Sequence, residues 1–453
     1  MPAASVILAN VIGTGVFVKA RVMTCNVGTP GMVLTVWVVA GLLSLAGALL
    51  YAELCTMMPR SGGEFHFLGA AYGRRWAFLY GWTKTVAQGA SVAAVAIVFV
   101  VFLNDLTGGK LSGAAVGWLP VAVIVVVTGI NLASMRWSGH LATALTGVKV
   151  LLVLCVGVGG FVFADGSWAH FGQSGLAGAC EGVPEGARLG LGGFGAAMLG
   201  ALWSYNGTNV IAAVGGEVHD PGRTLPRALV GSSLLVMALY LMLNAAFFYV
   251  LSPDEVAGVP ESSSVAQVAA SRFMGGAAAA VMAAGLMISA YGTLHTTLLT
   301  GPRLPYALAQ AGLLPSILGR LSAHAVPAVA VLGLGLWSIV LTLSGTFDIL
   351  TDIYVFVLWV FYGMTGAAVF VLRRRFPDAE RPYRVWGYPI VPALFSLVTV
   401  YLLVNTLVAT PGRALAGLGL IAVGLPVYAF FSRRPAAAKT PSWLGGEETD
   451  EVG

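Results

Sequence analysis

The sequence predicts an all-α polytopic membrane protein with 12 transmembrane helices. Of its 453 residues, 58% are hydrophobic and only 9% are charged, whereas soluble domains average about 25% charged residues. So little polar surface cannot cover a folded chain in water, which excludes a soluble enzyme, a disordered protein and a nucleic-acid-binding protein. The apolar runs are unbroken and often exceed the roughly 20 residues that a spanning helix needs. A membrane β-barrel is excluded, because its strands are segments of about 10 residues in which apolar and polar residues alternate, and the apolar runs here show no such alternation.

Twelve apolar segments carry this prediction. They lie at 3–25, 30–57, 76–103, 116–134, 141–164, 192–215, 228–251, 264–300, 326–345, 347–372, 388–409 and 414–431. We expect helices 1–5 within 1–165, helices 6–10 within 190–375, and helices 11 and 12 within 386–432. The remaining segment, 433–453, is polar and rich in Ala, Pro and Gly, and is predicted to be a disordered cytoplasmic tail.

The basic residues predict the orientation. Of the 24 Lys and Arg residues, sixteen fall in loops on the side of the termini, six fall on the other side, and Lys84 and Lys149 lie inside spans. Loops rich in Lys and Arg stay in the cytoplasm, so we expect a multi-pass protein of the cell membrane with both termini inside. The residues assigned to the outer side are Lys19, Arg21, Lys110, Arg188, Arg272 and Arg413.

The first apolar run does not resemble a cleavable signal peptide, because it has no basic start and continues into a glycine-interrupted motif. About ten residues precede that interruption, or roughly 15 Å of helix, which fits a missing cytoplasmic tail or a clipped start. The four cysteines lack the spacing of a metal site, and no metal or other cofactor is predicted. Cys55 and Cys155 are expected in the core, while Cys25 and Cys180 both face outside and their pairing stays open.

Two spans are interrupted in corresponding places. The first contains VIGTGVF (11–17) and the sixth contains LWSYNGTNV (202–210), and each begins a group of five spans. Such a matched pair is the best sequence pointer to a transporter binding site. Glycine alone more often marks close helix packing, and the chain has 59 glycines. The pair in register favours a site over packing.

The chemistry of a broken helix indicates the ligand. Backbone N–H and C=O groups freed inside a membrane must line a cavity or bind a ligand, because lipid cannot satisfy them. The N-terminus of the outer half-helix suits a carboxylate, and the freed carbonyls suit an ammonium. One broken pair therefore offers a receptor for a zwitterion, the part that all amino acids share.

Five motifs resemble the amino acid–polyamine–organocation superfamily. VIGTGVF resembles its helix 1 motif, and YAELCTMMPRSGGEFHFL (51–68) looks like helix 2 with the following loop. WSYNGTNVIAAVGGEVHDPGRTLPRAL (203–229) looks like helix 6 and the 6–7 loop. YGTLHTTLLTGPRLPYALAQAGLLP (291–315) is similar to helix 8 and its amphipathic segment, and FVLRRRFPDAERPYRVWGYPIVPALF (370–395) to the helix 10–11 loop of the L-type amino-acid transporter branch.

The resemblance implies a five-plus-five inverted-repeat, leucine-transporter-like fold with two further helices and alternating access around a central site. It implies that the N–H groups of Thr14 and Gly15 hold the substrate carboxylate. It also implies that the carbonyls of Val11, Trp203 and Asn206 hold the ammonium, with Trp203 as an aromatic gate. The substrate-binding residues implied are Val11, Ile12, Gly13, Thr14, Gly15, Trp203, Ser204, Asn206 and Asn209.

The chain departs from the family pattern in places that leave substrate preference open. Asn206 stands where L-type members usually have Gly, Thr208 where animal members have Trp, and 216–217 reads Gly–Glu instead of Glu–Glu. Animal L-type members join a glycoprotein through a cysteine between helices 3 and 4. Here that loop, 104–118, contains no cysteine, so a disulfide-linked heavy chain is not expected.

Ionisable residues within the spans are functional candidates, because inserting a charge costs about 2.5–3.5 kcal/mol. Lys149 is predicted to reach the break in helix 1 and helix 8 and to act as the coupling residue; the alternative is a lysine that snorkels to the interface. For Lys84 the two alternatives stay open. Glu53 is expected to pair with a loop arginine, His295 to be a polar packing residue, and 304–315 to lie along the inner face.

These features predict a secondary transporter, not an enzyme. The favoured hypothesis is exchange of neutral L-amino acids, and the alternative is symport with protons. Cationic amino acids or polyamines are a third hypothesis, disfavoured because Glu53 and Glu217 lie towards the inside and cannot pair with a second ammonium. An intramembrane enzyme needs a nucleophile or metal cluster, and a sensor needs a signalling domain; the sequence offers neither.

Overall fold

The computed structural model describes residues 7–8, 11–58, 63–133, 138–175, 180, 182–207, 221–322 and 326–432. Within these ranges the regular structure is helical and contains no strand. Three short 3-10 helices, η1 (Trp168–Gly172), η2 (Glu185–Ala187) and η4 (Ser316–Gly319), lie in connecting segments. The α-helices are α2 (Gly15–Val27), α3 (Pro30–Met57), α4 (Glu64–Tyr72), α5 (Arg74–Leu106), α6 (Gly113–Ala133), α7 (Ser138–Phe163), α8 (Gly190–Ser204), α10 (Pro221–Val250), α11 (Pro253–Ala257), α12 (Val265–Thr300), α13 (Arg303–Gln310), α14 (Ala328–Ser344), α15 (Phe347–Arg375), α16 (Ile390–Ala409) and α17 (Pro411–Ser432).

Each of the twelve predicted segments overlaps a described helix. In the part of the chain that the structure describes, seven helices are long and apolar enough to cross a membrane, namely α3, α5, α6, α10, α15, α16 and α17. The chain is therefore a multi-pass membrane protein, while the total of twelve crossings stays a prediction. Several helices begin before the predicted apolar segment. For example, α10 begins at Pro221 and its segment at 228, because hydropathy marks only the apolar part of a helix and polar residues can extend it.

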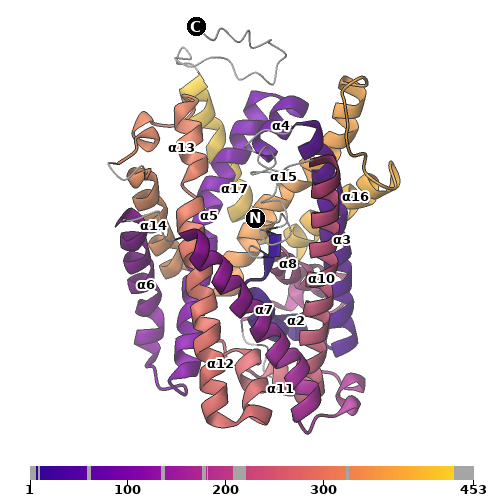
Figure 1. Ribbon diagram of the computed structural model, residues 1–453, viewed down its shortest axis with the longest axis vertical. Coiled ribbons are helices and arrows are strands. Elements are labelled where there is room, and N and C mark those ends of the chain that lie inside the picture. The colour runs from indigo at the N-terminus through magenta and orange to yellow at the C-terminus, as the bar shows by residue number, and fades with distance from the viewer. Residues whose placement is uncertain are drawn as a thin grey trace.

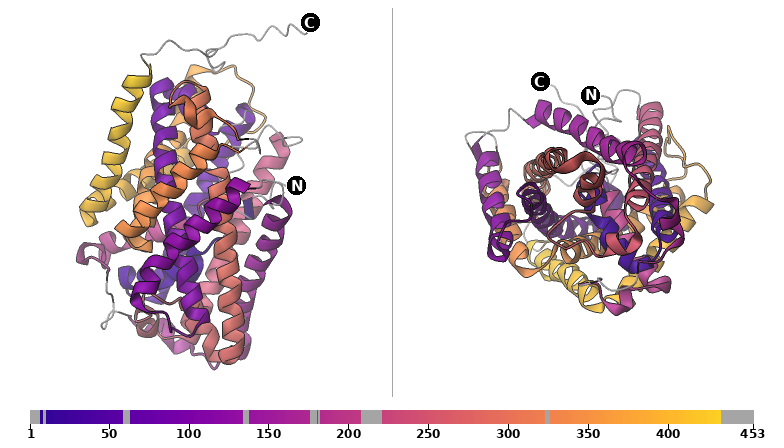
Figure 2. Two further views of the ribbon diagram at one scale, coloured as in Figure 1. Left: turned by 90° about the vertical axis from the view of Figure 1, so that its left-hand side faces the viewer. Right: turned by 90° about the horizontal axis from the view of Figure 1, so that it is seen from below.

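The helices run along the long axis of one bundle (Figure 1). We call its two ends the α13 end, where α4 and α13 lie, and the α11 end, at the bottom of Figure 1. Seen from the α11 end, α6 and α17 lie at the periphery (Figure 2, right). Only 22% of the apolar window of α6 and 17% of that of α17 is buried, against 72% for α5. The peripheral helices therefore face lipid, and α5 belongs to the interior.

Local signals fix where the helices start. Thr29 caps α3, with Pro30 in the first turn, and the Thr346 side chain accepts from the Ile349 amide at the start of α15. At α11, Ser252 and Glu255 form a reciprocal capping box. Burial raises the pKa of Glu255, but hydrogen bonds from Ser252 and the nearby Arg272 charge outweigh it and leave that pKa below its ordinary value.

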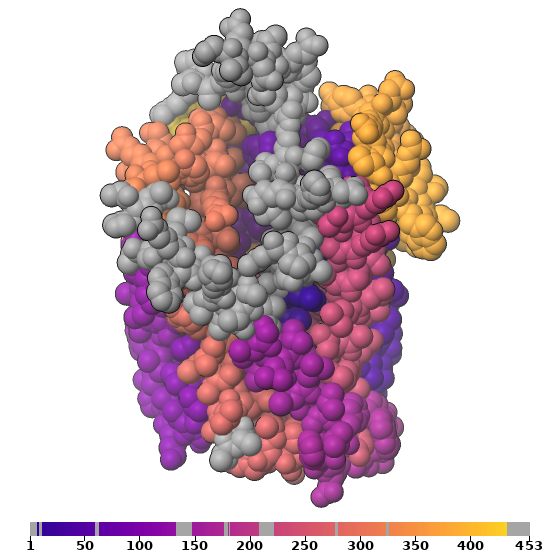
Figure 3. Space-filling view, in the orientation of Figure 1, coloured from indigo at the N-terminus to yellow at the C-terminus, as the bar shows by residue number. Residues whose placement is uncertain are grey.

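Motifs that the sequence predicts to be cytoplasmic meet at the α13 end. Glu53 on α3 accepts two hydrogen bonds from Arg373, at 2.8 and 2.6 Å, and one from the Val385 amide at 2.6 Å. The predicted pairing of Glu53 with an arginine is thus confirmed. Val385 belongs to the segment between α15 and α16, and its side chain is buried in the core of the bundle; the orange surface at the upper right of Figure 3 includes this part of the chain. The amphipathic α13 buries Pro305 and Leu308 against the bundle.

The cysteines divide into one bonded pair and two thiols. Cys25 in α2 and Cys180 before α8 form a disulfide, which resolves the pairing that the sequence left open. Cys55 is buried as predicted, but the core assignment of Cys155 is wrong, because its side chain on α7 is exposed. A helix that is apolar all round does not reveal which face meets lipid, so sequence could not distinguish these cases.

Candidate functional site

The two interrupted spans meet inside the bundle. α2 begins at Gly15 and α8 ends at Ser204, and the two helices lie near the centre of the molecule (Figure 1). A Cβ placed on Gly15 would overlap the Ser204 hydroxyl and lie 2.8 Å from Cδ1 of Trp203. A glycine is therefore required at position 15 for this close approach. The two predicted breaks are 190 positions apart in the chain, by the numbers of Gly13 and Trp203, and the fold brings them side by side.

Tyr240 of α10 joins the two breaks. Its hydroxyl lies 2.9 Å from the Val11 carbonyl oxygen and 3.0 Å from the Ser204 carbonyl oxygen. One hydroxyl proton is shared between two acceptors, so both carbonyls keep lone pairs for a further donor. The sequence carries no signal for this role, because a tyrosine within an apolar helix is equally typical of a core or an interface position.

The start of α2 is not capped by a side chain. Thr14 occupies the N-cap position, yet its side chain accepts no hydrogen bond from the first turn. The Thr14 carbonyl instead accepts from the Phe17 amide at 3.2 Å. A helix start without a side-chain cap presents N–H groups and a positive dipole end, which favour an anion such as a carboxylate.

The end of α8 turns sharply away from helical geometry. The Asn206 amide donates to the Trp203 carbonyl at 3.2 Å, and Gly207 has a φ of 123°, a conformation that favours glycine. Beside this turn lies a cavity of about 40 Å³, bordered by Asn206, Gly207, Tyr51 and Tyr362 among others. Such a cavity holds a few water molecules but is smaller than an amino acid.

Trp203 stands between the breaks and α15. Its ring meets Tyr354 edge-on, with centroids 5.2 Å apart, and Phe347 edge-on at 6.3 Å. These are favourable aromatic geometries, so the indole is held by α15 and not only by its own helix. Asn209, the remaining predicted binding residue, lies outside the described residues.

The structure corrects the predicted location of Lys19. The sequence predicts Lys19 on the outer side in a loop, whereas it lies in α2 with only 1% of its side chain exposed. Its ammonium is 2.5 Å from Oδ1 of Asp348, 2.8 Å from the Thr351 hydroxyl and 4.6 Å from the centre of the Phe347 ring. Arg21, assigned in the same way, is also buried and lies 3.5 Å from Glu261.

The sequence does contain a signal for Lys19. The residue lies inside the predicted span 3–25, four positions after Gly15, where an ionisable side chain is a functional candidate by default. The prediction of a loop position for Lys19 is wrong because α2 is a short helix surrounded by protein, so Lys19 meets partners on α15 instead of water. The same helix α15 holds Asp352 in an ion pair with Arg413.

The remaining intramembrane cations point into the bundle. Lys149 is 5% exposed and donates to the Thr293 hydroxyl of α12 at 2.9 Å, which is the helix 8 side of its predicted contacts. Among the described residues, no contact of its ammonium with the helix 1 break is found. Lys84 approaches Tyr354, with its ammonium 3.4 Å from the hydroxyl. His295 lies 3.2 Å from the Asn131 amide, as a polar packing residue should.

The described residues contain no group of three or more His, Cys, Asp or Glu that could hold a metal ion. What they do contain is a helical membrane bundle in which the uncapped start of α2 lies beside the end of α8, with carbonyls at Val11 and Ser204 that have lone pairs to spare. Paired interruptions of this kind are typical of secondary transporters, a class of protein that binds small polar ligands in mid-membrane.

Comparison with known proteins identifies the family. A profile described as amino acid permease matches residues 2–431, and the chain belongs to that family. The serine/threonine exchanger SteT of Bacillus subtilis (strain 168) is 30% identical over 440 residues, covering 96% of each chain. The human b(0,+)-type amino acid transporter 1 is 29% identical, covering 90% of this chain and 82% of its own. The human cystine/glutamate transporter is 28% identical over 94% of this chain and 83% of its own.

These relatives are membrane transporters or exchangers of amino acids and not enzymes. The similarity to the large neutral amino acids transporter small subunit 2 of Mus musculus, which covers 94% of this chain, agrees with the L-type resemblance of the sequence. The chain is therefore an amino acid permease by family, with one bacterial exchanger and several animal transporters among its relatives.

Proposed function

We propose that this permease is a secondary active transporter that moves neutral L-amino acids across the cell membrane by alternating access, in exchange for another amino acid. The observation that carries the proposal is the meeting of the uncapped start of α2 with the end of α8 at Gly15 and Ser204. Donors and acceptors of the backbone lie together there without charged side chains, which suits the zwitterionic part of any amino acid.

The roles follow from this geometry. The N–H groups of Thr14 and Gly15 bind the substrate carboxylate, and the carbonyls of Val11, Trp203 and Asn206 bind its ammonium. Tyr240 supports this assignment, because its hydroxyl positions the Val11 and Ser204 carbonyls. Ile12, Gly13, Ser204 and Asn209 complete the binding residues. Trp203 closes over the substrate, held by α15.

Neutral cargo is favoured over cationic cargo by the acids near the site. A second substrate ammonium needs a carboxylate of its own, and the nearest acids on α15 are Asp348 and Asp352. Asp348 is paired with Lys19 and Asp352 with Arg413. Both carboxylates are already neutralised by protein cations, which leaves the pocket suited to a substrate without a side-chain charge.

The proposed architecture consists of two repeats, additional helices and a tail in a defined orientation. The spans in 1–165 and in 190–375 form two inverted five-helix repeats, and those in 386–432 are additional, with 433–453 as a cytoplasmic tail. The α13 end faces the cytoplasm, since it carries Arg373 and the other loop arginines, and the α11 end faces outside. No disulfide-linked heavy chain is proposed. Lys149 couples substrate binding to the conformational change.

Counterflow in liposomes tests the function. Purified protein is reconstituted in vesicles loaded with unlabelled alanine, serine, leucine or arginine, and uptake of the same radiolabelled compounds is followed with and without an inward proton gradient. We expect uptake that requires an internal neutral amino acid and does not respond to the gradient. Gradient-driven uptake into empty vesicles would instead establish proton symport, and uptake of arginine alone would reject neutral cargo.

A further inference from the structure

A groove opens between the start of α5 and the last turns of α17 at the α13 end. Its volume is about 500 Å³, within the roughly 300–1,000 Å³ that is typical of small-molecule sites. α17 lies at the periphery of the bundle, with only 17% of its apolar window buried (Figure 2). The groove therefore belongs to the lipid-facing surface and not to the proposed substrate site. Arg75 lines it from α5, and the residues that line it from α17 are Leu425, Pro426, Tyr428, Ala429 and Ser432.

Close packing beneath the groove fixes its shape. The Tyr428 ring lies against the Phe78 ring of α5, with centroids 5.3 Å apart. Further towards the α11 end, the Trp82 indole donates a hydrogen bond to the Leu420 carbonyl at 3.0 Å. A Cβ on Gly424 would lie 2.6 Å from Cδ1 of Trp82, so the two helices touch there. These contacts hold α5 and α17 together, and the groove is a recess built into their junction.

Arg75 brings a positive charge to the groove without a neutralising partner. Its side chain is exposed, and its guanidinium makes no hydrogen bond or ion pair within the described part of the chain. Other arginines at this end are engaged, as Arg373 is by Glu53. The first turn of α5 contains no acidic residue, and α17 contains none along its whole length. The groove therefore attracts an anion.

The polarity of the lining changes with depth. Arg75 and Ser432 lie at the ends of their helices, where the membrane interface is expected. Leu425 precedes Ser432 by seven residues in α17, which places it about 10 Å deeper along the helix axis. Between them lie Pro426 and Ala429, which are apolar and exposed. The groove is thus polar and cationic at its mouth and apolar along its floor.

This combination of charge and apolar surface selects the ligand. A guanidinium binds a phosphate through two parallel hydrogen bonds. A free phosphate would use only the mouth of the groove, whereas a phospholipid also covers the apolar floor. Basic pockets between membrane helices bind anionic lipid headgroups in the same way. A zwitterionic headgroup suits the site less, because it carries a cation of its own towards Arg75.

We propose that the groove between α5 and α17 binds an anionic phospholipid of the leaflet at the α13 end, with its phosphate on Arg75 and its acyl chains along Leu425 and Ala429. The bound lipid joins the peripheral helix α17 to the interior helix α5 and stabilises the folded bundle. This site goes beyond the proposed function and depends on no transported substrate.

Lipid titration followed by native mass spectrometry tests the site. Purified full-length protein in detergent micelles is titrated with phosphatidylglycerol, and the dissociation constant of the first bound lipid is determined. Arg75→Gln should raise this constant about tenfold, because a charged hydrogen bond to the phosphate is lost. Phosphatidylcholine should bind the unmodified protein as weakly as phosphatidylglycerol binds Arg75→Gln. Phosphatidylglycerol should also raise the melting temperature of the unmodified protein more than that of the variant.

Two variants separate a built site from general attraction between charges. Arg74→Gln removes the same charge one position away, from a residue that does not line the groove, and should leave the dissociation constant unchanged. Ala429→Phe keeps Arg75 and fills the floor of the groove, so it should weaken phosphatidylglycerol binding as strongly as Arg75→Gln. Because Ala429 is exposed, this variant also tests the site if Arg75→Gln fails to fold.

Two other occupants are distinguished in the same titration. Inorganic phosphate at the concentration of the lipid should not displace phosphatidylglycerol, and displacement would assign the groove to a soluble anion. The other occupant is the acidic end of the chain itself, whose four carboxylates are Glu447, Glu448, Asp450 and Glu451. Replacing them by Gln and Asn should leave the dissociation constant unchanged. Tighter lipid binding by that variant would assign the groove to the chain end.

The remaining outcomes are equally distinct. Equal binding of phosphatidylglycerol by Arg75→Gln and the unmodified protein would overturn the proposal. Equal weakening by Arg74→Gln, or full binding by Ala429→Phe, would also overturn it, because the charge would then act without the groove. The titration contains no amino acid substrate, so lipid binding can succeed where amino acid exchange fails in liposomes, and the reverse also holds.

Discussion

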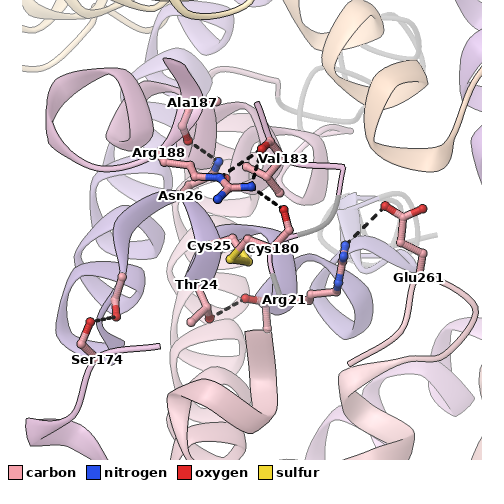
Figure 4. Close-up of a disulfide and its surroundings, with 12 residues drawn as sticks. Arg21, Thr24, Cys25, Asn26, Ser174, Cys180, Val183, Ala187, Arg188 and Glu261 are labelled. Atoms are coloured by element: carbon pink, nitrogen blue, oxygen red, sulfur yellow. Dashed lines mark hydrogen bonds and ion pairs between the residues drawn. A yellow bond between two sulfur atoms is a disulfide. The ribbon is translucent and has the colours of Figure 1, made fainter. Parts of the chain in front are cut away.

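α2 and α8 meet at two ends that are built in opposite ways. At the α11 end, Cys25 and Cys180 are bonded and Asn26 makes hydrogen bonds through both its carbonyl and its side chain (Figure 4). At the other end, Gly15 touches Ser204 and the first turn of α2 has no side-chain cap. One end, the fastened end, satisfies its polar groups within the protein, and the other, the open end, is the end whose backbone groups we propose bind a ligand.

The difference teaches how a broken helix survives inside a membrane protein. Freed backbone groups cost free energy in a dry environment, so the elements that carry them must be held by contacts elsewhere. Here the fastened end supplies those contacts and keeps the open end aligned. We therefore expect substitutions at the open end to abolish function with little loss of stability, and substitutions at the fastened end to do the opposite.

The largest effect is expected for Gly15→Val at the open end. A branched side chain at this position overlaps Ser204 and the Trp203 ring, so the two breaks can no longer meet. Substrate binding and uptake should be abolished, as measured by radiolabelled uptake in liposomes. Gly147→Val is the matched control, because a Cβ there meets no atom within 4 Å. Retained binding by Gly15→Val would contradict the placement of the site.

Lys149→Ala should have the next largest effect. This buried ammonium bonds Thr293, and its loss is expected to cripple transport and weaken substrate binding. Thr293→Val removes the bonding partner and keeps the charge, so it should impair transport less. Uptake and binding are compared in the same vesicles. Uptake by Lys149→Ala at the level of the unmodified protein would reject the coupling role.

Cys25→Ser tests the fastened end. The disulfide closes a loop with a sequence separation of 155, and loss of such a bond typically costs about 2–4 kcal/mol of stability. We expect a lower melting temperature in detergent under non-reducing conditions, with substrate binding retained by the folded fraction. Cys155→Ser, which removes an exposed thiol, should melt like the unmodified protein. Equal melting of both variants would show that the disulfide does not fasten the helices.

Tyr240→Phe tests how much one hydrogen bond at the open end contributes to substrate binding. It removes the hydroxyl shared by the Val11 and Ser204 carbonyls but keeps the buried ring. One hydrogen bond contributes about 1 kcal/mol, so substrate affinity should fall by roughly fivefold. Tyr205→Phe is a suitable control, because its hydroxyl bonds the Trp37 carbonyl of α3 and neither the Val11 nor the Ser204 carbonyl. An equal effect of both substitutions would indicate general packing.

The smallest effect is expected for Thr14→Ser. Thr14 is argued to act through its backbone N–H, and its side chain makes no capping bond in α2. Apparent affinity for substrate should therefore change by less than about twofold, a difference below 0.5 kcal/mol. A severe loss of uptake would mean that the threonine side chain itself contacts the substrate, which would contradict the backbone account.

The sequence by itself determined where the apolar segments lie and which two places interrupt them, at the start of α2 and the end of α8. Length and hydropathy suffice for this, because a membrane demands about 20 apolar residues per crossing and tolerates interruptions only at special places. The segments at 30–57 and 388–409 agree closely with α3 and α16. The motifs around Gly15 and Trp203 likewise mark the two breaks without any structure.

Only the tertiary structure decided which side chains meet across the bundle. Lys19 and Asp348 are separated by 329 positions, and Cys25 and Cys180 by 155. Tyr240 reaches both breaks from α10, and Cys155 faces outwards from α7. Such contacts depend on how each helix is rotated and which helix lies beside it. In helices that are apolar nearly all round, the local pattern of residues does not encode that rotation, so packing alone sets it.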